Sequence, residues 1–84
     1  MPNPPRPPAH LAAAHSGDRL EVVRVDGDDT LSHRLGDLGF FPGVEVLVEH
    51  SSLFGSPKSY RLHGYRLALR KDEAVRVQVK PITP

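Results

Sequence analysis

The fold of this chain depends on the segment RLGDLGFFPGVEV, residues 34–46. Leucines before and within it recur at the spacing of one helix face, which predicts a helix over Thr30–Leu38. Asp29 or Thr30 can cap the first turn of this helix. Gly39 suits the C-terminal cap, since glycine accepts the positive φ that ends many helices.

A turn and a β region follow the helix. Pro42-Gly43 predicts the turn, because proline fixes φ at the first central position and glycine accepts a positive φ at the second. Of the two phenylalanines before it, Phe40 and Phe41, we expect one in the core and the other exposed. Beyond the turn, apolar and polar residues alternate with the period of a β-strand. Strands are predicted at 44–49, 59–63, 65–70 and 75–80.

A fifth strand is expected earlier in the chain, over Asp18–Asp26. Its alternation slips at Val22-Val23, which predicts either a β-bulge or burial on both faces. A short helical turn is expected at Leu11–Ala14, and Lys71–Ala74 is expected to be a tight turn.

These elements predict a mainly β fold, a small five-stranded SH3-like barrel with one short helix after the first strand and a short N-terminal helical turn. Closing such short strands into a barrel would remove most of their exposed edges. We expect the domain to cover residues 10–80. Residues 1–9 are expected to form a disordered proline-rich tail, because prolines fill five of the first eight positions, and residues 81–84 a second tail.

The composition argues against several classes of protein. At 84 residues the chain has room for one domain, and without cysteine it has no disulfide, zinc finger or cysteine nucleophile. It contains neither a GxSxG nor a GxxxxGK[ST] motif, so we expect no enzyme. The absence of a long apolar run or a secretory signal predicts a cytoplasmic protein with no direct membrane insertion.

Two groups of motifs together resemble the FeoA family. Residues 34–46 follow the family pattern RL-xx-LG-Φ-x-PG-xx-V, where Φ is apolar. The second half of the chain matches it in order and spacing at Gly55-Ser56-Pro57, Gly64, Leu67-Ala68-Leu69-Arg70 and Glu73-Ala74. The resemblance extends over Leu11–Val79. One departure is Gly36, which stands in the helix where a better helix former is usual.

The resemblance implies a non-catalytic accessory protein of bacterial ferrous iron uptake. Its expected partner is FeoB, the membrane transporter with a cytoplasmic GTP-binding domain, and no cofactor is required. The domain is also similar to the SH3-like module of iron-dependent repressors, so a regulatory domain that binds a transition metal is the alternative. A small barrel that binds nucleic acid is a third alternative, although our prediction is a protein partner and no nucleic acid.

A metal site is one candidate feature. Asp29, His33 and Asp37 are spaced four residues apart, which places neighbouring members on the helix face away from the leucines. Imidazole and carboxylate groups suit iron or zinc. A weakly bound divalent ion there would also be able to bridge two molecules into a weak homo-oligomer. The alternative interpretation is a solvated helix face.

Charge points to a second candidate, a contact surface. Residues 1–57 carry a net charge of −4 and residues 58–84 one of +5, an asymmetry that favours an acidic partner. If the last three strands pair in sequence, their outward arginines form one basic strip. Its members are Arg61, Arg66, Arg70 and Arg76. The alternative is a solvated face on which these arginines pair with glutamates.

The third candidate is the loop that contains Leu53 and Phe54. These two residues are apolar in an otherwise polar segment, which is typical of a docking tip. The alternative is that both fold over the mouth of the barrel.

Overall fold

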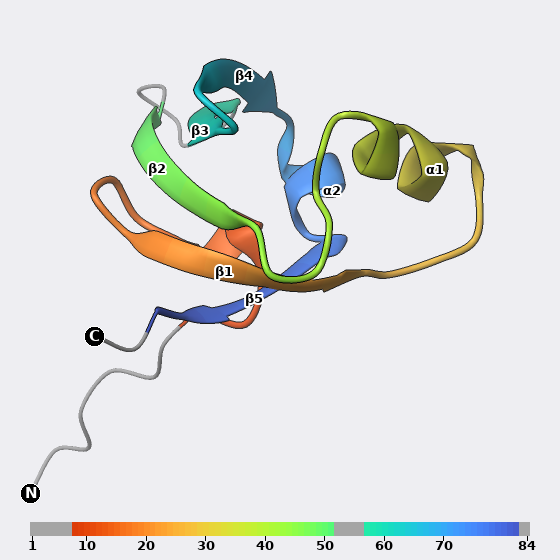
Figure 1. Cartoon of the computed structure of the whole chain (residues 1–84). Coiled ribbons are helices and arrows are strands. Elements are labelled where there is room, and N and C mark those ends of the chain that lie inside the picture. The colour runs from red at the N-terminus through yellow and green to blue at the C-terminus, as the bar shows by residue number, and fades with distance from the viewer. Residues whose placement is uncertain (1–7, 52–56, 83–84) are drawn as a thin grey trace, which may run out of the picture.

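The computed structural model describes residues 8–51 and 57–82 of the chain (Figure 1). Most of its regular secondary structure is β-strand, and one 3-10 helix and two short α-helices make up the rest. In chain order these are η1 (Leu11–Ala13), β1 (Arg19–Val25), α1 (Thr30–Asp37), β2 (Glu45–Ser51), β3 (Lys58–Leu62), β4 (Tyr65–Leu69), α2 (Lys71–Ala74) and β5 (Val77–Pro81).

The five strands form one antiparallel sheet in the order β4-β3-β2-β1-β5. This confirms the mainly β, five-stranded prediction. The hydrogen-bonded ladder itself does not close into a ring, because β4 and β5 lie at its opposite edges. In Figure 1 the sheet curls, and α2 connects its two edges. The helical turn carries the chain from β4 across to β1, where β5 pairs.

The core lies on the inner face of the curled sheet. Each strand contributes alternate side chains to it, as the period-2 pattern predicts. Among the described residues, fourteen hydrophobic ones are buried in it: Leu11, Ala14, Leu20, Val22, Leu35, Phe40, Val46, Val48, Tyr60, Leu62, Leu69, Ala74, Val77 and Val79. Complete burial of a side chain the size of Val, Leu or Phe contributes about 1.5–3 kcal/mol, so these residues supply the main driving force for folding.

The segment that follows Thr30 behaves as its sequence predicts. Asp29 caps α1 by accepting a hydrogen bond from the backbone N–H of Ser32 at 3.2 Å. Leu35 is fully buried, and Gly39 ends the helix with a φ of +111°. Phe40 is 2% exposed and Phe41 is 53% exposed, which confirms that one of the two fills the core.

The irregularity in the first strand is a β-bulge. The register of β1 against β5 shifts between Val22 and Arg24, and Val23 stays 38% exposed. The bulge interpretation is therefore confirmed over burial of both faces.

The N-terminal turn is part of the folded domain. The Nζ of Lys58 donates to the carbonyl oxygens of Ala12 and Ala14, at 3.0 and 2.5 Å. The hydroxyl of Tyr60 reaches the carbonyl of Leu11, and burial raises the pKa of Tyr60 to about 12. A lysine at the carbonyl end of a helical turn also complements its dipole. These bonds fix η1 against β3.

The tight turn expected at Lys71–Ala74 is instead the helical turn α2. The carboxylate of Glu73 accepts from the backbone N–H of Arg70 at 2.9 Å, and the N–H of Ala74 donates to the carbonyl of Arg70 at 2.8 Å. These bonds coil the segment, so β5 begins at Val77. Val75, expected in the strand, lies outside it and is 40% exposed.

The two glycines around the end of α1 should respond oppositely to alanine. Gly36→Ala should raise the free energy of unfolding by about 1 kcal/mol, because a Cβ there meets no atom within 4 Å and alanine is the better helix former. Gly39→Ala should lower it by about 1–3 kcal/mol, since φ is positive and the Cβ would lie 2.7 Å from the His63 ring. Urea unfolding followed by circular dichroism measures both. Effects of the same sign would contradict this account.

Candidate partner-binding surfaces

The outer face of the sheet carries a row of four facing residues. Arg19 of β1 is the partner of Leu47 on β2, Leu47 is the partner of Arg61 on β3, and Arg61 is the partner of Arg66 on β4. We call these four residues the arginine row. Outward side chains of facing residues lie side by side. The row therefore aligns three arginines with the half-buried Leu47, which lies between Arg19 and Arg61.

Two glutamates of β2 neutralise part of the arginine row. The Glu49 carboxylate contacts Arg61 at 2.5 Å and Arg66 at 2.6 Å. The bond to Arg61, helped by the charge of Arg66, lowers the pKa of Glu49. Glu45 lies 3.7 Å from Arg19, a longer and looser ion pair. Like charges at facing positions are thus tolerated because a shared carboxylate lies between them.

The predicted basic strip is only partly present. Arg61 and Arg66 are neighbours, but Arg70 lies outside the strands, at the start of α2. Arg76 precedes β5, which pairs with β1 and not with β4, so the last three strands do not pair in sequence. The prediction of one strip of four arginines is therefore wrong. The nucleic-acid alternative loses its main electrostatic support, which was that strip.

Arg76 belongs to a different contact, at the start of α1. Its two terminal nitrogens donate to the two carboxylate oxygens of Asp29, at 3.0 and 2.9 Å. A third bond reaches the carbonyl of Asp26 at 3.2 Å. The contact with Arg76 and the capping bond from Ser32 hold the pKa of Asp29 well below its usual range. This two-pronged pair fastens the loop before α1 to the beginning of β5.

The three predicted metal ligands are not brought together. Asp29 is occupied by Arg76, and the Nε2 of His33 lies 3.1 Å from the carboxylate of Asp28. Asp37 is exposed on the same helix. Within residues 8–51 and 57–82, no three metal-ligating side chains are grouped as a metal centre requires. The residues present thus do not fit a resident metal; sequence spacing could not reveal that an arginine 47 positions away binds the first of them.

A small hollow opens on the outer face beside the arginine row, with a volume of about 220 Å³. Leu47 and the buried Leu62 contribute its apolar part. The other lining residues are Arg19, Glu45, Arg61, His63 and Gly64. Sequence reasoning did not identify this hollow, because it combines residues of three strands and a turn.

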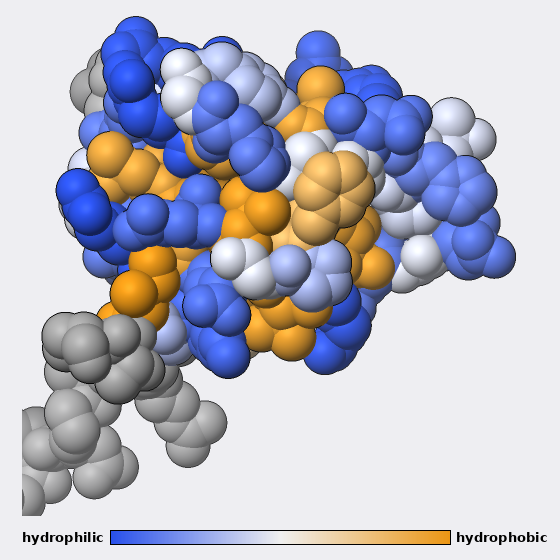
Figure 2. Space-filling view, in the orientation of Figure 1, coloured by the Kyte–Doolittle hydropathy of each residue, from blue (hydrophilic) through white to orange (hydrophobic). Residues whose placement is uncertain are grey.

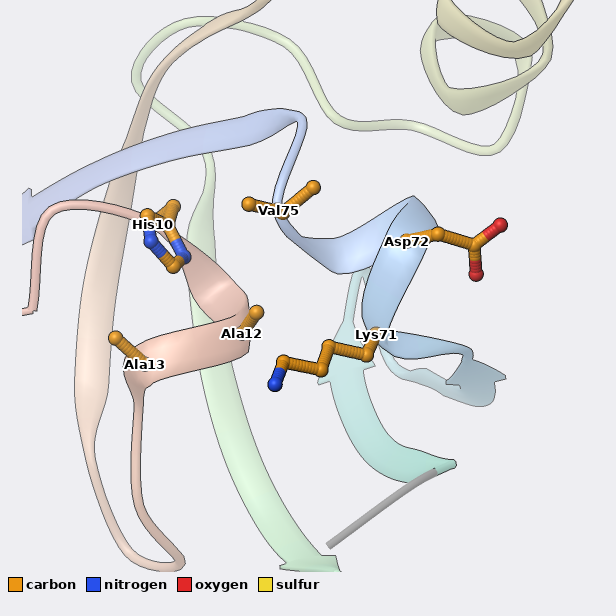
Figure 3. A pocket seen from close by; sticks show the side chains of 6 residues that line it. All are labelled: His10, Ala12, Ala13, Lys71, Asp72 and Val75. Carbon is orange, nitrogen blue, oxygen red and sulfur yellow. The ribbon is translucent and has the colours of Figure 1, made fainter.

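A larger groove of about 710 Å³ runs between η1 and α2 (Figure 3). Ala12 and Ala13 of η1 line one side, and Lys71 and Asp72 of α2 the other. His10 and Val75 complete the lining. The Nδ1 of His10 is buried without a hydrogen-bond partner among the described residues.

Aromatic side chains form an exposed corner near the end of α1. Phe41 packs edge-on against the His63 ring, with 6.5 Å between ring centroids. The Nε2 of His63 is 2.9 Å from the carbonyl of Gly39, and the hydroxyl of Tyr65 donates to the carbonyl of Leu38. Figure 2 shows hydrophobic surface between hydrophilic side chains in the middle of this face of the molecule. Such uncovered apolar surface is typical of a contact region.

The remaining predicted contact residues, Leu53 and Phe54, lie outside the described residues. In the part of the chain that the structure describes, no helix has the length and apolar character needed to cross a membrane.

A curled five-stranded sheet with arginines and aromatic residues on its outside defines a small SH3-like domain with surfaces suited to contact. The chain belongs to the FeoA domain family, whose sequence profile matches residues 9–81. This confirms the resemblance inferred from the motifs.

A curated relative links this family to a transporter. The chain is similar to the Fe(2+) transport protein A/Fe(2+) transporter FeoB fusion protein of Porphyromonas gingivalis, with 30% identity over 73 residues. That region is 87% of this chain and 9% of the fusion protein, so the chain spans about a tenth of its relative's length.

Solved structures support the fold. A FeoA-like protein from Clostridium acetobutylicum superimposes with a TM-score of 0.84 at 25% identity, over 94% of this chain and 92% of that one. Stenotrophomonas maltophilia FeoA complexed with zinc, described as a prokaryotic SH3 domain protein, gives 0.76 at 31% identity over 84% and 88%. A manganese-dependent transcriptional repressor shares the fold, with a TM-score of 0.78 at 22% identity over 93% of this chain and 44% of that one.

The pair of Asp29 and Arg76 predicts a pH-dependent stability. Asp29→Asn should lower the urea midpoint at pH 7, and the difference from the unchanged protein should shrink progressively as the solution is acidified to pH 2. The pKa of Asp29 is depressed in the folded state, so its stabilisation is complete above an unfolded pKa of about 4 and is lost as the pH falls below it. Urea unfolding between pH 7 and pH 2 measures this loss.

Asp37→Asn is the matched control, since Asp37 is on the same helix and forms no ion pair with any described residue. A difference between Asp29→Asn and the unchanged protein that persisted undiminished at pH 2 would contradict the assignment.

Proposed function

We propose that this protein is a non-catalytic cytoplasmic accessory factor of bacterial ferrous iron uptake, and that it binds FeoB and modulates its activity. Residues 10–80 form the binding domain. The observation with the most weight is the relative in which transport protein A and FeoB are named as one fusion protein. Two functions that are joined in one polypeptide in one organism commonly act as associated chains in another.

Other relatives agree with an accessory role. One solved structure with 29% identity is that of an iron uptake regulatory protein, and the zinc-bound relative is described as possibly acting as a ferrous iron transport activating factor. A binding domain needs no nucleophile or general base.

The contact with FeoB would use Arg61 and Arg66 of the arginine row, and Arg70 at the start of α2. Leu53 and Phe54, which lie outside the described residues, are also assigned to it. Arg61 and Arg66 are 46% and 57% exposed at their side chains, so both can reach a partner. Arginine is enriched at protein interfaces because its planar group makes several hydrogen bonds from one side chain.

Retention on immobilised FeoB tests this proposal. The soluble cytoplasmic domain and the full-length transporter in detergent should each be tried as bait, both from the organism that encodes this chain. We expect retention by at least one of them, with affinity lowered about tenfold in Arg61→Ser/Arg66→Ser, since lost charge pairs at an interface weaken binding.

The matched control is Arg24→Ser, which removes an exposed arginine of β1 that pairs with Asp26 and is not a member of the arginine row. Its binding should be unchanged. The absence of retention on either bait, together with unchanged iron uptake when the gene is deleted, would contradict the proposal.

A second candidate is weak binding of ferrous iron or zinc at α1. It is supported by the zinc complex of the Stenotrophomonas maltophilia relative and by the exposed contact of His33 with Asp28. Asp37 lies one turn further along the helix. Only one imidazole and isolated carboxylates are available there, so the site would hold a divalent ion weakly or share it between two molecules.

Zinc titration followed by NMR tests the second candidate. The His33 signals should shift only at zinc concentrations well above micromolar, and His33→Ala should abolish the effect. His15→Ala, which removes another exposed histidine, should leave it in place. Tight zinc binding that survives His33→Ala would contradict a site on α1.

A further inference from the structure

We propose that the hollow between Arg19 and Arg61 holds one apolar side chain of an acidic segment of FeoB. This inference rests on the proposed function, because FeoB supplies the segment. It adds a specific binding position, lined by Leu47 and Gly64, to a contact whose structurally described members so far are arginines.

The size of the hollow favours a side chain as its occupant. Its volume of about 220 Å³ is below the roughly 300–1,000 Å³ that pockets for small molecules and cofactors span. Leu47, half-buried on β2, and Leu62, 2% exposed, give the hollow an apolar part. A polar ion alone would leave this apolar surface uncovered, whereas a leucine or similar side chain would remove it from water.

Gly64 keeps one side of the hollow open. It turns the chain between β3 and β4 with a φ of +80°, and a Cβ placed on it would meet nothing within 4 Å. The wall at this point is therefore bare backbone, against which a partner can pack closely.

The charges around the hollow favour an acidic partner. Three arginines of the arginine row face two glutamates of β2, which leaves one positive charge in excess. Arg19 is the least engaged of the three, since its side chain is 69% exposed and its ion pair with Glu45 spans 3.7 Å. Its guanidinium can turn to a partner carboxylate without losing a close hydrogen bond. Complementary charge of this kind guides encounter and fixes register.

The rim of the hollow is held in place before any partner arrives. His63 has a φ of +52°, a region uncommon for residues other than glycine, and its ring is hydrogen-bonded to the carbonyl of Gly39. Phe41, 53% exposed, packs against the same ring. A fixed aromatic rim lowers the entropy lost on binding and adds apolar contact at the border of the hollow.

An NMR titration with short peptides tests the hollow independently of FeoB. The probe is a blocked pentapeptide with leucine at its centre and two glutamates on each side. At millimolar peptide, amide signals of Arg19, Leu47, His63 and Gly64 should shift. Replacing the central leucine by glycine, or the four glutamates by lysines, should weaken binding at least fivefold. Absent shifts, or shifts confined to the groove between η1 and α2, would overturn the proposal.

Variants of the protein sharpen the same titration. Arg19→Glu should weaken binding of the acidic peptide about tenfold, and Arg19→Ser should weaken it less. The matched control is Arg24→Glu, on the same strand and also exposed and ion-paired, which should bind as the unchanged protein does. Circular dichroism establishes that all variants are folded. Equal binding by Arg19→Glu and Arg24→Glu would overturn the role of the hollow.

The FeoB retention experiment, repeated with Arg19→Glu, separates the two proposals. If FeoB retains the unchanged protein and does not retain Arg19→Glu, the result supports both the proposed function and the hollow. Equal retention of both proteins overturns the hollow and leaves the proposed function standing. Failure of the unchanged protein to bind FeoB, with the peptide still bound at the hollow, contradicts the proposed function and overturns FeoB as the source of the acidic segment.

Discussion

Burial of alternate side chains on five short strands is the constraint on which the rest of this structure depends. When a chain of 84 residues folds, about 40% of the surface that the unfolded chain exposes stays in contact with water. The inner face of each strand therefore has to enter the core. Among the described residues, Ser32 is the one buried residue that is polar. The interior therefore has little room for a polar site, and recognition falls to the outer face, the turns and the groove between η1 and α2.

The outer face shows how charge is managed on so small a sheet. Glu49 lies between Arg61 and Arg66 and permits two arginines at facing positions. Arg76 does not join these arginines, because its guanidinium binds Asp29 and stabilises the loop before α1. Arginine thus stabilises the fold at Asp29, whereas Arg61 and Arg66 stay about half exposed on the sheet.

Much of the fold was predictable, while the candidate site was predictable only in part. Periodicity is a local property, and it identified the strands, the helix and an irregularity at Val22-Val23. The pairing with β5 was needed to decide that this irregularity is a bulge and not burial on both faces. The metal prediction treated Asp29 as a free ligand on a helix face. The assignment of Asp29 is wrong because its ion pair with Arg76 joins residues far apart in the chain, which spacing along one helix does not reveal.

The sequence by itself determined the number of strands, the caps and turns around residues 34–46, and membership of the FeoA domain family, because each depends on residue type at short range. Only the tertiary structure decided which strands are neighbours. In that order β5 pairs with β1 and not with β4, so the predicted arginine strip is divided. The same order aligns Arg19 with Arg61 on the two sides of Leu47. The physical reason is that strand pairing is set by packing of the whole core, whereas alternation within one strand records only which of its faces is buried.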